Sequence, residues 1–151
     1  NGNDLKIDYQ CILPEDVVEQ KLSFDVVINM EVIEHVTNPE FFISSCSQLV
    51  KPGGVMVCST LNRTLKSLAF AKIGAEYILR WLPRGTHKWG AFITPSEFTS
   101  LLRNQGFTVG DVRGMAYSLF YDEWILTNNL DVNYLIFAKK ESDCGVYESL
   151  R

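Results

Sequence analysis

The sequence predicts an α/β protein with a doubly wound sheet, and two observations support this fold class. Short runs of β-branched and other apolar residues alternate along the chain with segments of helical periodicity. Two of these runs, 24–30 and 55–60, are joined by a segment with helix start and stop signals, the pattern of a right-handed strand–helix–strand unit. In such sheets ligands bind beyond the carboxyl ends of the strands, so a functional site is expected there.

Composition narrows the class of protein. The chain has 151 residues, of which 46% are hydrophobic and 21% charged, as is usual for one globular domain. Its net charge of −4 argues against a dedicated nucleic-acid binder, which needs a basic face. No apolar run reaches the roughly 18 residues that span a bilayer, so a soluble or peripheral protein is expected. The chain begins at Asn1 without an initiator methionine, and we expect it to be part of a longer protein.

The cysteines predict buried thiols in a reducing compartment. They have no Cys-x-x-Cys pairing and fall within apolar runs, at Cys11, Cys46, Cys58 and Cys144. This pattern indicates neither a disulfide framework nor a zinc site.

The first part of the chain contains a predicted strand, a short helix and a second strand. Apolar and polar residues alternate over 5–11, which is the period of a strand with one buried face. Pro14 then opens a helix that runs to about Gln20. The compact apolar run 24–30 fits a central strand that is buried on both faces in a parallel sheet.

A capped helix is predicted between the two central strands. Asn38 is a favourable N-cap and Pro39 a favourable first helical residue, so a helix is expected to run to about Val50. The Lys-Pro-Gly-Gly segment 51–54 ends it, and 55–60 follows as the next strand.

The second part of the chain is predicted to add a helix and two strands. Residues 94–97 form a capping box with proline at the first helical position, and Gly106 is a natural helix terminator. Strands are expected over 107–112 and 131–140, whereas 114–129 carries several aromatic residues without a clean period.

Three side chains with the chemistry of a catalytic or metal site follow the 24–30 strand directly: Glu31, Glu34 and His35. If this segment turns helically, all three lie on one face. Two carboxylates and an imidazole so placed could hold a magnesium, manganese or zinc ion. The alternative interpretation is that residues 34–36 cap the turn and that His35 hydrogen-bonds the backbone.

Four segments together resemble the second half of the class I S-adenosylmethionine-dependent methyltransferases: 24–27, 34–36, 38–39 and 49–54. The resemblance implies a Rossmann-like sheet of which this chain holds strands three to seven. The glycine-rich cofactor loop and the acid that binds the cofactor ribose would precede Asn1. Residues Ile12 and Leu13 would then border the adenine of S-adenosylmethionine, and Met30 would lie against the cofactor. Residues 1–140 would be the C-terminal part of one domain, with 62–93 as an insertion and 141–151 as a tail.

Further segments narrow the resemblance to the O-methyltransferases of ubiquinone biosynthesis: 30–35, 59–63, 74–80, 83–87 and 131–134. That family methylates phenolic hydroxyls of polyprenylated catechol intermediates. The resemblance implies a divalent cation, with magnesium as the expected ion, held by Glu31, Glu34 and His35. A cation would help because a phenol that ionises near pH 10 is a poor nucleophile at neutral pH. The rival role for His35 is that of a general base. Two alternative functions remain: methylation of another small molecule without a metal, or a lipid-binding fragment without activity.

Residues 62–93 carry six basic residues and one acid in an otherwise acidic chain. Apolar and aromatic residues interleave with these charges, so the segment could lie on an anionic bilayer. The resemblance favours this peripheral contact, either at the cytoplasmic face of the bacterial inner membrane or at the matrix side of the mitochondrial one, with other ubiquinone-biosynthesis proteins as further partners. The alternative is a solvated helix over the core.

The remaining aromatic and histidine residues receive weaker interpretations. Tyr117, Phe120, Tyr121 and Trp124 could line a pocket for the quinone head, although packing as core or lid is the commoner role of such residues. His87 lies in a loop flanked by glycine and proline and is given no role.

Overall fold

The computed structural model describes residues 6–69, 89–118 and 120–142. Its strands are β1 (Phe24–Met30), β2 (Val50–Leu61), β3 (Phe107–Ser118), β4 (Glu123–Thr127) and β5 (Asn133–Lys140). Its helices are α1 (Pro14–Glu19), α2 (Pro39–Gln48), α3 (Leu65–Leu68) and α4 (Pro95–Asn104), with 3-10 turns η1 (Ile33–His35) and η3 (Trp89–Ala91). None of the described helices is long and apolar enough to cross a membrane.

The described strands form one mixed sheet in the order β1-β2-β5-β3-β4. Strand β1 is parallel to β2, with Ile28 opposite Val57, and helix α2 makes the crossover between them, as the sequence predicts. The pairs β2–β5, β5–β3 and β3–β4 are antiparallel. The α/β fold class is confirmed.

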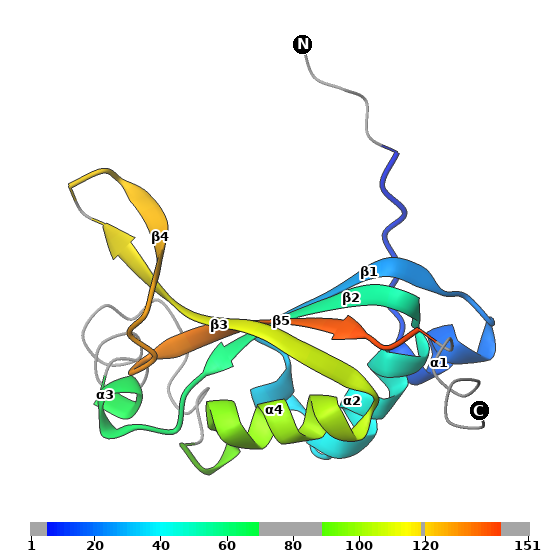
Figure 1. Cartoon of the computed structure of the whole chain (residues 1–151), viewed down its shortest axis with the longest axis horizontal. Helices are drawn as coiled ribbons and strands as arrows, with labels where there is room; N and C mark the ends of the chain where they lie inside the picture. Colours follow the sequence, from blue (N-terminus) through cyan, green and yellow to red (C-terminus); the bar gives the residue numbers. More distant parts are fainter. Residues whose placement is uncertain (1–5, 70–88, 119, 143–151) are drawn as a thin grey trace, which may run out of the picture.

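The hydrophobic core lies between one face of this sheet and helices α2 and α4 (Figure 1). Period-two alternation turns Met56 and Cys58 of β2 and Ile136 of β5 toward these helices, where all three are fully buried. Tyr134 is also fully buried, and its hydroxyl donates a hydrogen bond of 2.7 Å to the carbonyl oxygen of Ile93. Burial therefore leaves this phenol hydroxyl with a partner.

Two of the predicted helix starts, those of α2 and α4, are confirmed by their caps. The side chain of Asn38 accepts a hydrogen bond of 3.0 Å from the backbone N–H of Phe41 at the start of α2. At the start of α4, Thr94 and Glu97 form the reciprocal capping box that the sequence predicts.

Several predicted boundaries differ from the structure. Residues 6–11 form no strand, and this part of the prediction is wrong: the segment is exposed, and none of the described strands pairs with it. Strand β2 begins at Val50 and runs through the glycines that were expected to form a turn. The aperiodic segment 114–129 is largely a β-hairpin, because β3 continues to Ser118 and pairs with β4. Within the predicted insertion 62–93, the structure describes α3 and η3, and 70–88 lies outside the described residues.

Candidate functional site

Glu31 turns the chain sharply where β1 ends. Its φ is +53°, a left-handed conformation that is uncommon for a residue with a side chain. Hydrogen bonds to β2 hold this turn in place: the backbone N–H of Glu31 donates to the carbonyl oxygen of Ser59 at 3.0 Å, and the Ser59 hydroxyl donates to Glu31 Oε1 at 2.7 Å. One carboxylate oxygen of Glu31 is thereby anchored to the neighbouring strand.

Glu34 is buried in the 3-10 turn that follows. The residue is 6% exposed, and the hydroxyl of the fully buried Thr60 donates a hydrogen bond of 2.8 Å to its Oε2. A carboxylate so deep in a protein needs such a partner, because desolvation penalises its charge. The contact fixes η1 against β2, while His35 in the same turn remains exposed.

The three predicted metal ligands do not share one helical face. Helical geometry begins only at Ile33, and the left-handed conformation of Glu31 breaks the turn before it, so the predicted i, i+3, i+4 arrangement is wrong. Within 6–69, 89–118 and 120–142, no three His, Cys, Asp or Glu side chains are grouped so that they could hold a metal ion. Glu31 and Glu34 each bond a hydroxyl of β2 through one carboxylate oxygen. In this arrangement the residues do not fit a shared cation.

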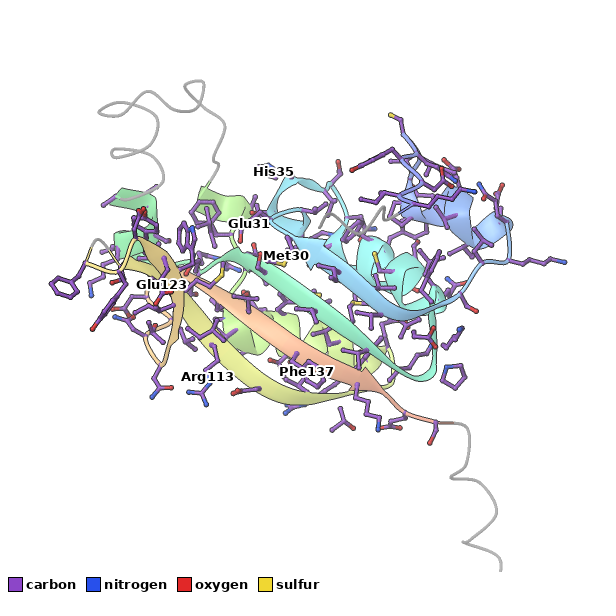
Figure 2. The ribbon with its side chains drawn as sticks, turned by 90° about the horizontal axis from the view of Figure 1, so that it is seen from above. Met30, Glu31, His35, Arg113, Glu123 and Phe137 are labelled. Carbon is purple, nitrogen blue, oxygen red and sulfur yellow. The ribbon has the colours of Figure 1, made fainter. Side chains whose placement is uncertain are left out.

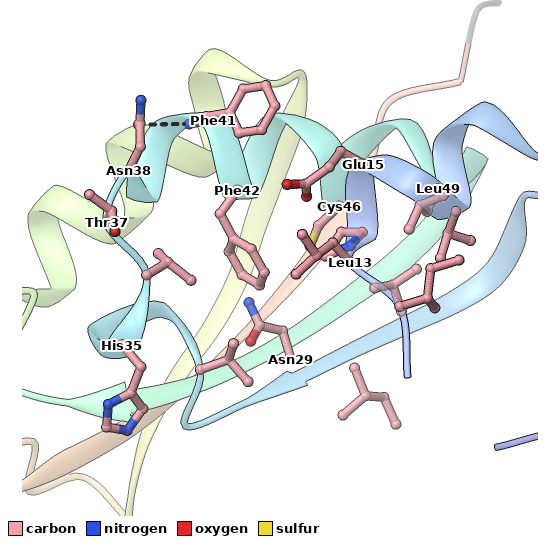
Figure 3. A pocket seen from close by; sticks show the side chains of 17 residues that line it. Leu13, Glu15, Asn29, His35, Thr37, Asn38, Phe41, Phe42, Cys46 and Leu49 are labelled. Atoms are coloured by element: carbon pink, nitrogen blue, oxygen red, sulfur yellow. Dashed lines mark hydrogen bonds between the residues drawn. The ribbon is translucent and has the colours of Figure 1, made fainter. Parts of the chain in front are cut away.

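A pocket of about 730 Å³ opens beside β1, between the strand and helices α1 and α2 (Figure 3). Ile12 and Leu13, predicted to border the cofactor, line it together with His35 and Phe42. Met30, the third predicted cofactor residue, lies at the end of β1 on the sheet face opposite the helices and is 41% exposed (Figure 2). The structure thus brings Ile12, Leu13 and His35 to one pocket and leaves Met30 outside its lining.

Asn29 is a polar residue of this pocket that was not predicted from the sequence. Asn29 is 4% exposed, yet within residues 6–69, 89–118 and 120–142 neither the nitrogen nor the oxygen of its side-chain amide has a hydrogen-bond partner. In Figure 3 the amide points from β1 toward Phe42 of α2. A buried amide without a hydrogen-bond partner costs free energy. The period-two burial of β1 was the available sequence signal, because it turns Asn29 inward beside Val27.

The aromatic residues considered for a quinone-head pocket lie on the β3–β4 hairpin, which projects beyond the rest of the sheet (Figure 1). Tyr117 and Trp124 face each other across the hairpin with ring centroids 5.5 Å apart, and Phe120 and Tyr121 pack edge to face at its tip. All four side chains are exposed. In this structure they form a surface cluster rather than the wall of a pocket.

Part of the basic segment 62–93 is described, and its charges are paired. Arg63 makes an ion pair with Glu97 of α4 and donates to the carbonyl oxygen of Phe92 at 2.7 Å. Lys66 makes an ion pair with Asp131 at 2.6 Å. The other basic residues of this segment, and also His87, lie outside the described residues.

Comparison with known proteins identifies the family. Residues 3–112 match the family model described as a methyltransferase domain. The chain belongs to this methyltransferase family. Solved structures agree on the fold: a possible histamine N-methyltransferase from Thermotoga maritima aligns with a TM-score of 0.56 at 18% identity, over 79% of this chain and 57% of its own. A magnesium protoporphyrin IX methyltransferase from Synechocystis, solved with bound SAH, aligns with a TM-score of 0.52 at 19% identity, over 80% and 46%.

Curated relatives of this methyltransferase domain are much more similar to it in sequence than these solved structures are. A ubiquinone biosynthesis O-methyltransferase of Bradyrhizobium is 47% identical over 136 residues, which are 90% of this chain and 53% of the relative. Proteins of the same name from Mesorhizobium japonicum and Paramagnetospirillum magneticum are 45% and 48% identical, over 55% and 53% of their lengths. The chain therefore spans about half the length of the curated relatives that it matches.

Proposed function

We propose that this chain is part of an S-adenosylmethionine-dependent O-methyltransferase that methylates phenolic hydroxyls of polyprenylated catechols in ubiquinone biosynthesis. The observation that carries the proposal is the identity of 45–48% to three relatives of that name, over about nine tenths of the chain. The similarity includes the loop after β1, which carries Glu31 and His35 beyond the end of the strand (Figure 2). This is the edge of the sheet at which α/β proteins bind their ligands.

S-adenosylmethionine would supply an electrophilic methyl group on a sulfonium. The accessible apolar side chains of Met30, Ile12 and Leu13 are suited to contact with its uncharged parts, and these are the residues we propose for its binding here. The acceptor oxygen would attack the methyl carbon as the carbon–sulfur bond breaks.

The acceptor must lose its proton for this attack, because a phenol with a pKa near 10 is mostly un-ionised at neutral pH. His35, exposed in η1 at the pocket, is proposed as the general base that takes the proton from the phenol oxygen. Glu31, held by Ser59, is the anionic group proposed to favour the charged imidazole that results.

The function is tested by incubating the complete protein that contains this chain with S-adenosylmethionine and a panel of phenol, amine and carbon acceptors. We expect methylation of a polyprenyl catechol and a loss of at least about a hundredfold in kcat for His35→Ala. His35→Ala should leave cofactor binding unchanged. A preference for an amine or carbon acceptor would sink the proposed substrate class while leaving the family assignment intact.

Assistance by a divalent cation is a separate prediction that the described arrangement of Glu31, Glu34 and His35 does not support. It is tested by assaying catechol methylation in a chelator and after adding back magnesium, manganese or zinc. Unchanged activity in the chelator would rule out the cation. A loss that one metal restores would require Glu31 or Glu34 to leave its hydroxyl partner on β2.

Membrane association through 62–93 is likewise proposed, because a polyprenyl substrate resides in lipid. Each basic residue near an anionic surface would contribute roughly 1 kcal/mol. We expect Lys72→Glu combined with Lys88→Glu to weaken sedimentation with phosphatidylserine vesicles, whereas Lys6→Glu, outside this segment, should not. If the unchanged protein, the double variant and Lys6→Glu all sediment equally, the membrane proposal is wrong and the solvated-helix interpretation holds.

A further inference from the structure

The loop after β1 is anchored to the neighbouring strand β2 through two consecutive residues, Ser59 and Thr60. Ser59 bonds Glu31 through both its backbone and its side chain. Its carbonyl oxygen and its hydroxyl oxygen accept from the N–H of Glu31 at 3.0 and 3.2 Å, and the hydroxyl donates to Oε1 at 2.7 Å. The hydroxyl of Thr60 donates to Oε2 of Glu34 at 2.8 Å. Ser59 and Thr60 are fully buried, so the loop supplies the hydrogen-bond partner that each buried hydroxyl needs.

These two anchors hold the loop from opposite faces of the sheet. Successive side chains of a strand point to opposite faces, and the side chain of Thr60 shares the face of Cys58, which packs toward helices α2 and α4. Ser59 lies on the other face and is opposite Met30 in the strand register. Between the two anchors, Ile33 is 1% exposed and belongs to the hydrophobic core. The loop is therefore fixed on both faces of the sheet and at a point between them.

The conformation of Glu31 indicates that its side chain has a role. A φ of +53° strains a residue that carries a Cβ, and such a residue persists only where its surroundings hold it. Glycine would adopt the same turn without strain. The bonds from Ser59 hold the strained residue and also fix one oxygen of its carboxylate. Backbone strain of this kind clusters at active sites and ligand clamps.

The same anchors determine where His35 lies. Its backbone N–H donates to the carbonyl oxygen of Val32 at 2.9 Å, and it directly follows the buried Glu34 in the 3-10 turn. Glu31 and His35 are exposed, whereas Ile33 and Glu34 are buried. Figure 2 shows Glu31 and His35 beyond the end of β1, at the edge of the sheet where a substrate is expected. The buried residues of the loop therefore present its two accessible ionisable groups to that edge.

We propose that Ser59 and Thr60 are positioning residues for the methyl transfer. Their hydroxyls fix the loop so that Glu31 and His35 meet the acceptor oxygen in one geometry. This inference rests on the proposed function, because it gives the two hydroxyls a role in the reaction at His35. Neither hydroxyl needs to touch the acceptor or S-adenosylmethionine. A displacement of about 1 Å at a reacting group can lower a rate about a hundredfold, so two small polar contacts are sufficient for this role.

The test measures methylation of a catechol with a short prenyl chain by the complete protein that contains this chain. Thr60→Val keeps the shape of the side chain and removes its hydroxyl, whereas Thr60→Ser keeps the hydroxyl. We expect kcat per titrated cofactor site, which counts folded protein only, to fall at least about tenfold in Thr60→Val and to stay within about twofold in Thr60→Ser. The KM for S-adenosylmethionine should be unchanged in both variants. An undiminished kcat in Thr60→Val would overturn the proposal, as would an equal loss in Thr60→Ser.

Ser59→Ala tests the anchor on the other face. It removes one buried oxygen, and with it the contact that fixes the Glu31 carboxylate, while the backbone bond between the two residues remains. We expect kcat per cofactor site to fall at least about tenfold here as well. Ser45→Ala is the matched control, because Ser45 is also a buried serine and its hydroxyl donates to the carbonyl oxygen of Phe41 within α2 at 3.1 Å. Equal kcat values for Ser59→Ala and Ser45→Ala would contradict the role of Ser59.

Backbone order parameters from NMR relaxation test the anchoring without methyl transfer. In Thr60→Val the order parameter of His35 should fall from about 0.85 to below about 0.6, while that of Ile136 in β5 stays near 0.85. An unchanged value at His35 would show that Thr60 does not hold the loop, and an equal fall at Ile136 would show a general loosening of the fold. Either result would overturn the proposal. Failure of the proposed function would appear instead as an unchanged protein that methylates no catechol.

Discussion

At the scale of single residues, the loop after β1 is held by two carboxylate–hydroxyl contacts to consecutive residues of β2. Glu31 is bonded to Ser59 and Glu34 to Thr60. The residue types and their closeness in sequence were sufficient to select Glu31, Glu34 and His35 as a functional group. Their arrangement was not predictable for two reasons. Glu31 adopts a left-handed backbone conformation although it is not a glycine, and the hydroxyls that hold Glu31 and Glu34 lie 28 and 26 residues further along the chain.

The buried pair Glu34 and Thr60 is expected to contribute to folding whether or not a metal binds. Glu34→Ala should reduce the free energy of unfolding by about 1–3 kcal/mol, since it leaves the fully buried Thr60 hydroxyl without this acceptor. Urea denaturation of Glu34→Ala, Thr60→Val and the double variant measures the coupling between them. The exposed Glu40→Ala on α2 is the control, with an expected change within about 0.5 kcal/mol. A coupling energy of zero would mean that the contact does not stabilise the fold.

Two buried thiols predict how stability changes at alkaline pH. Burial raises the pKa of Cys46 to about 11 and that of Cys58 to about 12. In the unfolded chain both thiols ionise near pH 9, so above that pH the unfolded state has lost protons that the folded state keeps, and stability falls. We expect the urea midpoint to decrease between pH 8.5 and 10.5. Cys58→Ala should make this decrease shallower, and an equally steep decrease would contradict the assignment.

Cys11 differs from these two, and the prediction that it is buried is wrong: it is exposed in the segment before α1. The alternation over 5–11 suggested a strand with an inward-facing thiol, but a strand needs a partner to pair with, and the described structure provides none. Cys144 lies outside the described residues.

At the scale of elements, the local signals that proved reliable were helix caps and compact apolar runs. The Asn38 cap and the Thr94 capping box mark the starts of α2 and α4, because these side chains satisfy backbone N–H groups within their own turn. The β3–β4 hairpin escaped prediction because Tyr117 and Trp124 are exposed on a projecting ribbon, where no buried face imposes a period of two.

The Thr94 cap gives a prediction for α4. Thr94→Ala removes the acceptor for the N–H of Glu97 and should cost about 1 kcal/mol of stability. Hydrogen bonds from the backbone and side chain of Thr94 also lower the pKa of Glu97. The contribution of the Glu97 carboxylate to stability is therefore present at neutral pH and is lost as this carboxylate protonates in acid. Ser100→Ala, exposed later in the same helix, is the control for urea denaturation at pH 7. Equal midpoints for the two variants would show that the cap contributes nothing.

At the scale of the whole molecule, the fold class and family could be predicted from sequence, because the motifs around β1, α2 and β2 specify a contiguous strand–helix–strand unit. The pocket could not be assigned in the same way. It is bounded by residues from the approach to α1, from β1 and from α2. One of them, Asn29, stands out only because its buried amide has no hydrogen-bond partner in the part of the chain that the structure describes. The curated relatives that this chain matches are about twice its length.

The most direct test of the central claim, ubiquinone O-methylation, is genetic complementation by the chimera of this chain with the rest of the Bradyrhizobium relative. It is expressed in a bacterium that lacks its own ubiquinone O-methyltransferase, and ubiquinone is measured by mass spectrometry of lipid extracts. We predict that the chimera restores ubiquinone and that its His35→Ala variant, present at the same level, restores far less. A folded chimera that binds S-adenosylmethionine but restores no ubiquinone would contradict the proposed function.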